Sequence, residues 1–181
     1  MLTCVNYRPG FVANPNTMFD ALWNGLEWER RGSTPRREFY CNDVNVPYVY
    51  GRGAGEREYL PKAMHPALAA LKSAVEGALG TVFEVAFLNG YEDAKDHLGW
   101  HADDSETMDD ARPIAIVTLG AEREIWFCPN ADRTDVTKLV LENGSLCVMA
   151  PGMQDTHWHR IPKAGFECGP RISITFRGYV A

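Results

Sequence analysis

The second half of this chain is a series of short β-rich segments separated by turn residues, and no other feature limits its possible folds as strongly. Branched and aromatic residues dominate residues 82–88, 114–119, 124–127, 138–141, 146–149 and 172–176. Many short strands at regular spacing are typical of an antiparallel sandwich or a jelly roll. Between two of these segments, Asn143-Gly144 predicts a tight hairpin turn.

Two helices are expected before the β-rich half. Asn14-Pro15 places a capping residue before a proline, and an apolar stripe at helical spacing continues from there to about residue 28. A second such stripe covers residues 66–79 and ends before Gly80. Because no internal repeat or linker is visible, the sequence predicts a single α+β, mainly β domain over residues 1–181.

Composition limits the compartment and the class of partner. Of the 181 residues 45% are apolar, yet no apolar run reaches the length of a membrane span. The N-terminus lacks a secretory signal, and five scattered cysteines favour a reducing compartment. We therefore expect a cytoplasmic protein, nuclear if eukaryotic, with no membrane partner. A net charge of −6 argues against tight, extended nucleic-acid binding but leaves room for a local basic patch.

One stretch, residues 30–55, places arginines among aromatic residues. It holds Arg30, Arg31, Arg36, Arg37 and Arg52 together with Phe39, Tyr40, Tyr48 and Tyr50. In nucleic-acid-binding proteins such residues contact phosphates and stack on bases. The same composition also fits a solvated loop or hairpin whose rings pack inward, so both interpretations stay open. Its glycine-rich turn, residues 51–55, lacks the Lys-Ser/Thr that follows a phosphate-binding loop.

A candidate metal site lies in residues 99–104, which read Gly-Trp-His-Ala-Asp-Asp. In an extended chain, residues two apart point to the same side, so His101 and Asp103 can bind one metal ion from one face. His159 would complete a set of two histidines and one carboxylate. That set leaves coordination positions open and suits the non-haem Fe(II) oxygenases. A His-x-Asp pair is common by chance, so this interpretation depends on the rest of the chain.

The last predicted strand alternates polar and apolar side chains. Its polar face is formed by Arg171, Ser173, Thr175 and Arg177. Near a metal ion, the two arginines can hold a dicarboxylate through bidentate, charge-assisted hydrogen bonds. Alternatively, both are solvent-facing charges on an edge strand. At the end of an earlier strand, Asn89 and Tyr91 either reach a bound acid or cap the strand.

Taken together, these motifs resemble the AlkB family of Fe(II)- and 2-oxoglutarate-dependent dealkylases. The resemblance extends over nearly the whole chain and is densest between Phe87 and Arg177. It rests on residues 88–91 (Leu-Asn-Gly-Tyr), 99–104, 112–115 (Arg-Pro-Ile-Ala), 119–121 (Leu-Gly-Ala), 144–149, 158–163 (Trp-His-Arg-Ile-Pro-Lys) and 170–177. No single motif is decisive, but their order and spacing together are highly specific.

The resemblance implies a double-stranded β-helix (jelly roll) over about residues 81–181. N-terminal helices would buttress it, and a nucleotide-recognition lid would occupy about residues 30–55. Fe(II) would be held by His101, Asp103 and His159. His157 is a rival third ligand because it has the same strand parity.

The resemblance also implies a site for 2-oxoglutarate. Arg171 and Arg177 would bind its two ends, helped by Asn89 and Tyr91. The chain departs from the family pattern at Ser173, where the family often has asparagine, and this weakens one expected contact with the co-substrate.

The implied substrate is alkylated DNA or RNA whose damaged base, of the 1-methyladenine or 3-methylcytosine type, is flipped out or single-stranded. Tyr50, with Tyr48, would stack on the base opposite the ring of His101. Asp104 would supply an acidic contact, and Arg123 a basic one. With 2-oxoglutarate and O2, an N-alkyl carbon would be hydroxylated and lost as an aldehyde, leaving succinate and carbon dioxide. We expect the enzyme to be a monomer.

Two other functions stay open. A related oxygenase could act on a protein or small molecule, which the acidic pI of about 5.4 and the imperfect acidic motif after Asp103 favour. A non-catalytic binding module on the same fold is the third hypothesis, and the intact set of candidate iron ligands and arginines argues against it.

Overall fold

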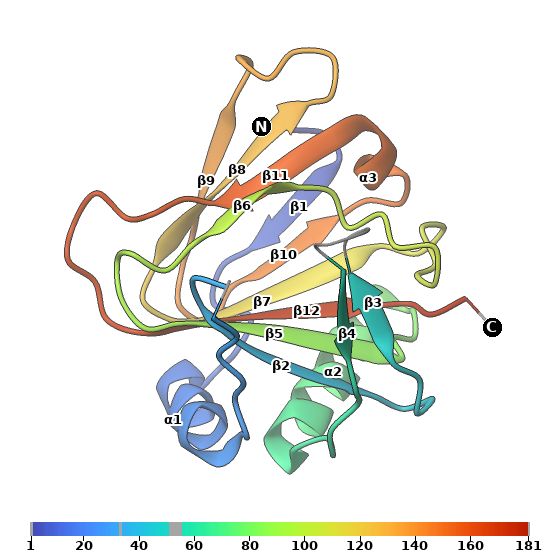
Figure 1. The fold of residues 1–181 in the computed structure, drawn as a ribbon, viewed down its shortest axis with the longest axis vertical. Coiled ribbons are helices and arrows are strands. Elements are labelled where there is room, and N and C mark those ends of the chain that lie inside the picture. Colours follow the sequence, from blue (N-terminus) through green and yellow to red (C-terminus); the bar gives the residue numbers. More distant parts are fainter. Residues whose placement is uncertain (1, 33, 51–55, 181) are drawn as a thin grey trace.

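The computed structural model describes residues 2–32, 34–50 and 56–180, and Figure 1 shows their arrangement. The elements in chain order are β1 (Val5–Arg8), α1 (Pro15–Gly25), β2 (Arg37–Asn42), β3 (Tyr48–Tyr50), β4 (Arg57–Tyr59), α2 (Pro66–Leu79), β5 (Val85–Tyr91), β6 (Leu98–His101), β7 (Ile114–Gly120), β8 (Arg123–Pro129), β9 (Thr137–Leu141), β10 (Leu146–Met149), α3 (Met153–Thr156), β11 (His157–Ile161) and β12 (Arg171–Arg177). The predicted turn at residues 51–55 lies outside the described residues.

Two antiparallel sheets face each other. The larger has six strands in the order β1-β10-β7-β12-β5-β2, and the smaller has four in the order β6-β11-β8-β9. Apolar side chains from both sheets form a common core between them, as Ile116 of β7 and Phe127 of β8 do. This is the predicted mainly β jelly roll.

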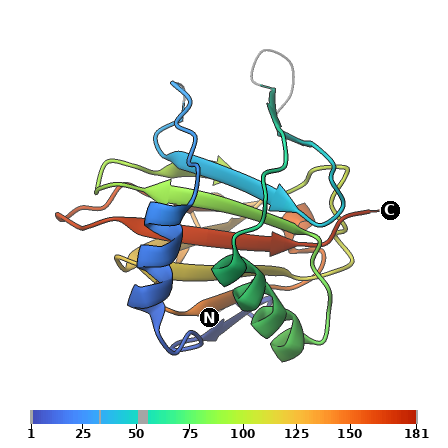
Figure 2. The same ribbon diagram turned by 90° about the horizontal axis from the view of Figure 1, so that it is seen from below.

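Both long helices cover the outer face of the six-stranded sheet (Figure 2). The alternation of β12 explains why: Ile172, Ile174 and Phe176 point toward the helices and pack in one core with Leu22 of α1 and Leu68 of α2. The polar residues of the same strand must therefore face the four-stranded sheet. Helix α2 matches the predicted range, and Gly80 ends it in a left-handed conformation with φ of 65°.

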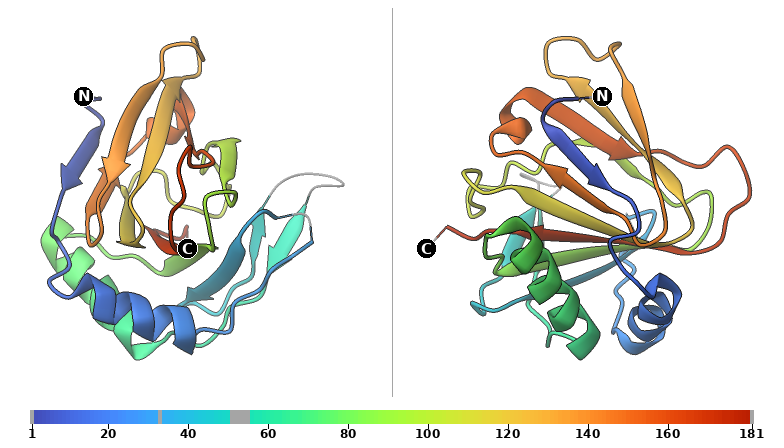
Figure 3. Two further views of the ribbon diagram at one scale, coloured as in Figure 1. Left: turned by 90° about the vertical axis from the view of Figure 1, so that its left-hand side faces the viewer. Right: turned by 180° about the vertical axis from the view of Figure 1, so that it is seen from behind.

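The six-stranded sheet includes strands that lie outside the predicted core of about residues 81–181. Strand β2 pairs with β5, and β1 pairs with β10, so both belong to the six-stranded sheet rather than preceding it. Strand β3, which lies in the expected lid, pairs instead with β4, just after it, in a small hairpin. Figure 3 shows this hairpin near the β2 edge of the large sheet. Local sequence indicates that a strand exists but not which distant partner completes its hydrogen bonds.

The expected hairpin at Asn143-Gly144 is also wrong. The turn is present, with Gly144 at φ of 79°, but β9 pairs with β8 whereas β10 pairs with β7 and β1. The chain therefore crosses from one sheet to the other. A side chain at Gly144 would meet Pro15 and the carbonyl oxygen of Val12 at 3.0–3.1 Å, so close packing as well as backbone conformation requires glycine.

Among the described residues, no helix is both long and apolar enough to cross a membrane.

Candidate active site

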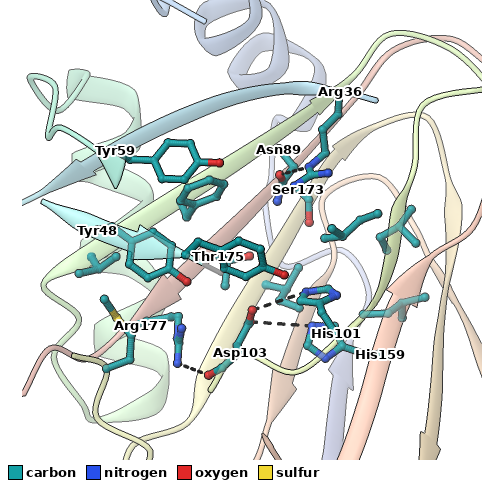
Figure 4. Close-up of a pocket in the computed structure, with 18 of the residues that line it drawn as sticks. Arg36, Tyr48, Tyr59, Asn89, His101, Asp103, His159, Ser173, Thr175 and Arg177 are labelled. Carbon is teal, nitrogen blue, oxygen red and sulfur yellow. Dashed lines mark hydrogen bonds and ion pairs between the residues drawn. The ribbon is translucent and has the colours of Figure 1, made fainter. Parts of the chain in front are cut away.

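His101, Asp103 and His159 meet between the two sheets (Figure 4). His101 and His159 are direct partners across the β6–β11 pair, and their ring centroids are 4.2 Å apart. Asp103 Oδ1 lies 3.5 Å from His101 Nε2, and Asp103 Oδ2 lies 3.8 Å from His159 Nε2. One potential ligand atom from each residue falls within 4.8 Å of the others. Such a cluster fits a metal bound by two histidines and one carboxylate.

The protonation states of this cluster suit metal binding. Burial and the neighbouring His101 lower the pKa of His159 to about 3, which keeps its imidazole neutral. Burial alone would raise the pKa of Asp103, but Arg177 and the two histidines lower it overall, so the carboxylate stays charged. His101 Nδ1 lies 2.9 Å from the Gly99 carbonyl oxygen; donating there leaves Nε2 free to bind a metal.

The argument from the sequence took residues 101–103 as extended chain, and the structure shows that β6 ends at His101. Asp103 reaches the cluster from an irregular segment, whose backbone is held at two points. The Asp103 N–H donates to Gln154 Oε1 at 2.9 Å, and the Asp103 carbonyl accepts from Arg177. The rival His157 lies outside the cluster, and its Nδ1 is 2.8 Å from Thr156 Oγ1.

Arg171 and Arg177 lie on the inner face of β12, near the centre of the six-stranded sheet. They are 0% and 4% exposed, so the alternative of solvent-facing charges on an edge strand is wrong. In the β12–β5 pairing, Arg171 lies opposite Tyr91, and Ser173 lies opposite Asn89. The four residues predicted to bind the co-substrate therefore share one sheet face.

Several polar atoms on this face have no hydrogen-bond partner among the described residues. They include Tyr91 Oη, Arg171 Nε and Nη1, and Arg177 Nη1. Burial lowers the pKa of Arg171 to about 10, a sign of how poorly its charge is solvated. Because unpaired buried donors are costly, this set fits a bound dianion that would complete their hydrogen bonds.

Arg36, immediately before β2, is a site residue that the sequence did not identify as such. It is 7% exposed, and its Nε donates to Asn89 Oδ1 at 2.6 Å while Nη2 donates to Glu38 Oε1 at 2.8 Å. The second oxygen of Glu38 accepts from the Tyr59 hydroxyl at 2.9 Å. This chain of contacts links β4 of the hairpin to Asn89. Figure 4 shows the contact between Arg36 and Asn89. The only sequence signal was an arginine two residues from a glutamate.

A hollow of about 480 Å³ lies beside the metal-ligand cluster, between the hairpin and residues 100–107. Tyr50, Asp104 and the ring of His101 contribute to its lining. Tyr48 also reaches it, but the Tyr48 ring is 7% exposed and packs against Tyr40, Tyr59 and Phe87. Of the two predicted stacking residues, Tyr50 is therefore the more accessible.

The expectation that Arg123 contacts the substrate is not supported by its position. Arg123 is 3% exposed, and its guanidinium donates to the backbone carbonyls of Asp93, Asp96 and Pro162. It does not line the hollow to which Tyr50 and Asp104 contribute. Arg123 therefore ties two loops together.

The arginines of residues 30–37 are mostly neutralised by acids. Arg30 pairs with Glu92 and Asp96, Arg37 with Glu92, and Arg31 with Glu29. Their aromatic neighbours Phe39 and Tyr40 are buried. Of the two interpretations of this stretch, the one in which the rings pack inward describes it better.

Comparison with known proteins identifies the family. A family model described as the 2OG-Fe(II) oxygenase superfamily matches residues 26–177. Alpha-ketoglutarate-dependent dioxygenase alkB homolog 3 of Bos taurus is 30% identical over 187 residues, which cover 93% of this chain and 64% of that protein. DNA oxidative demethylase ALKBH2 of Homo sapiens is 31% identical over 153 residues, which cover 80% of this chain and 57% of that protein.

The chain thus spans 64% and 57% of the length of these two curated relatives. The solved structure of OsALKBH1 has the same fold, with a TM-score of 0.72 and 14% identity over 99% of this chain and 98% of that one. The chain therefore belongs to the 2OG-Fe(II) oxygenase superfamily, and its curated relatives place it among the AlkB-type members.

Proposed function

We propose that this protein is an oxidative demethylase of N-alkylated nucleobases in DNA or RNA, acting as a monomer on a flipped or single-stranded base. Membership of the superfamily implies Fe(II) as the metal and 2-oxoglutarate and O2 as co-substrates. The observation that carries the proposal is the meeting of His101, Asp103 and His159 beside a hollow lined by Tyr50. The curated relatives named as an ALKBH2 DNA oxidative demethylase and an alkB homolog support it.

In this proposal, His101, Asp103 and His159 hold the iron through two neutral imidazoles and one carboxylate. When bound, the iron would supply the oxidation: O2 and 2-oxoglutarate would be consumed to give succinate and carbon dioxide, with one oxygen atom of O2 inserted into a C–H bond of the N-alkyl group. The resulting hemiaminal then releases an aldehyde and the restored base. Gln154 fixes the backbone of Asp103 and so holds its carboxylate in place.

The other polar groups bind and orient 2-oxoglutarate. Arg177, which contacts the Asp103 backbone, lies close to the metal ligands and would hold the carboxylate end nearer the metal, and Arg171 would hold the far end. Arg36 acts as a positioning residue for Asn89. Because the Asn89 oxygen accepts from Arg36, its NH2 group is left to donate toward the co-substrate.

The hollow beside the metal cluster would receive the base. Tyr50 and the His101 ring both line it and would stack on the base from two sides. Asp104 in the same hollow would favour a cationic base such as 1-methyladenine or 3-methylcytosine. A base within a duplex cannot reach this position without leaving the stack.

The test is turnover of a 1-methyladenine oligonucleotide with Fe(II), 2-oxoglutarate and O2. We expect demethylated product and succinate in equal amounts, detected by mass spectrometry. The matched control is Asp103→Asn, which retains size but removes the charge from the proposed ligand. Absence of product from an enzyme shown to bind 2-oxoglutarate with Mn(II) would contradict the substrate class.

A protein or small-molecule substrate is the second candidate, favoured by the two exposed carboxylates Asp104 and Glu106 in the lining of the hollow. Like charges disfavour a phosphate backbone at this position. Succinate formation that is stimulated by a peptide or metabolite mixture and not by methylated oligonucleotides would favour this candidate.

A further inference from the structure

The outer face of the four-stranded sheet carries a continuous row of alternating rings and cations. Trp100 of β6, Arg160 of β11, Trp126 of β8 and Lys138 of β9 follow one another across the strands. The Arg160 guanidinium lies 4.7 Å from the centroid of the Trp100 ring and 4.2 Å from that of the Trp126 ring, and Lys138 Nζ lies 4.1 Å from the centroid of the Trp126 ring. Beside this row, Arg133 lies 4.2 Å from the Trp158 ring.

The three cations of this face differ from the arginines of residues 30–37, most of which pair with acids. Within the described part of the chain, Arg133, Lys138 and Arg160 form no ion pair. Arg160 Nε is buried and has no hydrogen-bond partner among those residues. The carboxylate of Glu124 accepts from the Trp126 indole at 2.6 Å. In a chain of net charge −6, this face thus carries three cations without an ion pair among the described residues, beside the one carboxylate of Glu124.

The row is continuous with the proposed base site. Trp100 and Trp158 line the same hollow as Tyr50 and His101. The row of rings and cations therefore begins at that hollow and extends over the outer face of the sheet. Four strands at about 4.8 Å spacing make the row about 14 Å long. That length matches about four nucleotides at the phosphate spacing of a stacked strand.

We propose that this face binds the single-stranded nucleic acid flanking the target base, with Trp100 and Trp158 stacking on bases and Lys138 and Arg133 contacting phosphates. Unpaired cations beside accessible rings are the features by which proteins hold single strands without reading sequence, and Trp100 and Trp158 are half-buried. The inference rests on the proposed function for its substrate class. An acidic polypeptide would satisfy the cations but not the rings.

The experiment measures binding of unmodified single-stranded oligonucleotides to the full chain, without iron or turnover, by quenching of tryptophan fluorescence. The variant is the double substitution Lys138→Gln and Arg133→Gln, both at exposed positions. We expect at least about 5-fold weaker binding of a 12-mer and unchanged binding of a trimer. The slope of log affinity against log salt should fall by about 1.4, since each lost phosphate contact removes about 0.7.

The controls separate this role from a structural one. Lys163→Gln removes an exposed lysine outside the row and should leave binding of the 12-mer unchanged. The double variant Lys138→Arg and Arg133→Lys keeps both charges and should bind the 12-mer as tightly as the unsubstituted protein. Equal loss for trimer and 12-mer, no loss for either, or equal binding of poly-glutamate would overturn the proposal.

Because methylated bases and iron are absent from this assay, its outcome is independent of whether the enzyme demethylates nucleobases. Trp100→Leu adds a second test, since it keeps apolar cover over Arg160 while removing a stacking ring. We expect weaker 12-mer binding with an unchanged salt slope. A changed melting temperature with unchanged binding would show that the row only stabilises the sheet.

Discussion

The two sheets that face each other supply opposite halves of the site. The four-stranded sheet and the segment after β6 bring together two imidazoles and a carboxylate, whose groups already lie close to one another. The six-stranded sheet presents buried guanidinium groups, several of whose donors have no partner among the described residues. The first half is a compact local cluster. In the proposed function, a bound anion supplies the missing hydrogen-bond partners of the second half. Substitutions in the two halves should therefore change different properties of the enzyme.

The largest effect is expected on the metal side. Asp103→Ala removes the only anionic candidate ligand, and we expect Mn(II) affinity to fall by more than about 100-fold, because even residues that merely support metal ligands contribute 10–100-fold. Calorimetry or Mn(II) electron paramagnetic resonance measures this directly. Asp104→Ala is the matched control one residue along and should leave metal affinity unchanged. Normal Mn(II) binding by Asp103→Ala would show that the cluster is not the metal site.

A smaller effect on the other half sharpens the comparison. Arg171→Met should weaken 2-oxoglutarate binding about 10–100-fold, since hydrogen bonds to charged groups contribute about 1.5–3 kcal/mol. Without ligand, its free energy of unfolding should be unchanged or higher, because a poorly solvated buried charge has been removed. Calorimetry and chemical denaturation test the two parts. Arg171→Lys should also bind poorly, because an ammonium cannot replace a bidentate fork. A large loss of stability in Arg171→Met would mean that its charge is structural.

The smallest effect concerns the link between the hairpin and the co-substrate face. Arg36→Gln frees the Asn89 amide, and we expect the KM for 2-oxoglutarate to rise about 5–10-fold with little change in kcat, the equivalent of about 1 kcal/mol. Tyr59→Phe, which removes the contact with Glu38, should have a weaker effect in the same direction. Arg37→Gln is the matched control because that neighbouring arginine donates to Glu92 and not to Asn89. Equal effects in Arg36→Gln and Arg37→Gln would exclude a specific positioning role.

The contrast between the two groups of cations shows how composition can mislead. Residues 30–37 have the composition of a nucleic-acid-binding segment, yet their arginines are paired with Glu29, Glu92 and Asp96. The sequence did not identify Arg160 and Lys138 as binding residues, because their aromatic partners lie on other strands. Whether a cation is free to bind a phosphate depends on contacts that are distant in sequence.

The sequence by itself determined the chemistry and the class of fold. The alternation of β12, the helical stripe of α2 and the spacing of His101 and Asp103 are local patterns, and they predicted the β-rich jelly roll and the iron-ligand set. They succeed because side-chain direction follows from the backbone repeat within a few residues. The family resemblance then selected His159 rather than His157, and the structure brings His159 into the cluster.

Only the tertiary structure decided the partners. It placed β9 and β10 in different sheets despite the turn at Asn143-Gly144, and it brought β1 and β2 into the large sheet. It also turned Arg36 inward to Asn89 and held Arg123 between loops. The physical reason is the same in each case: strand hydrogen bonds and buried guanidinium groups must be satisfied by whatever lies across the fold, and neighbouring residues do not encode that choice.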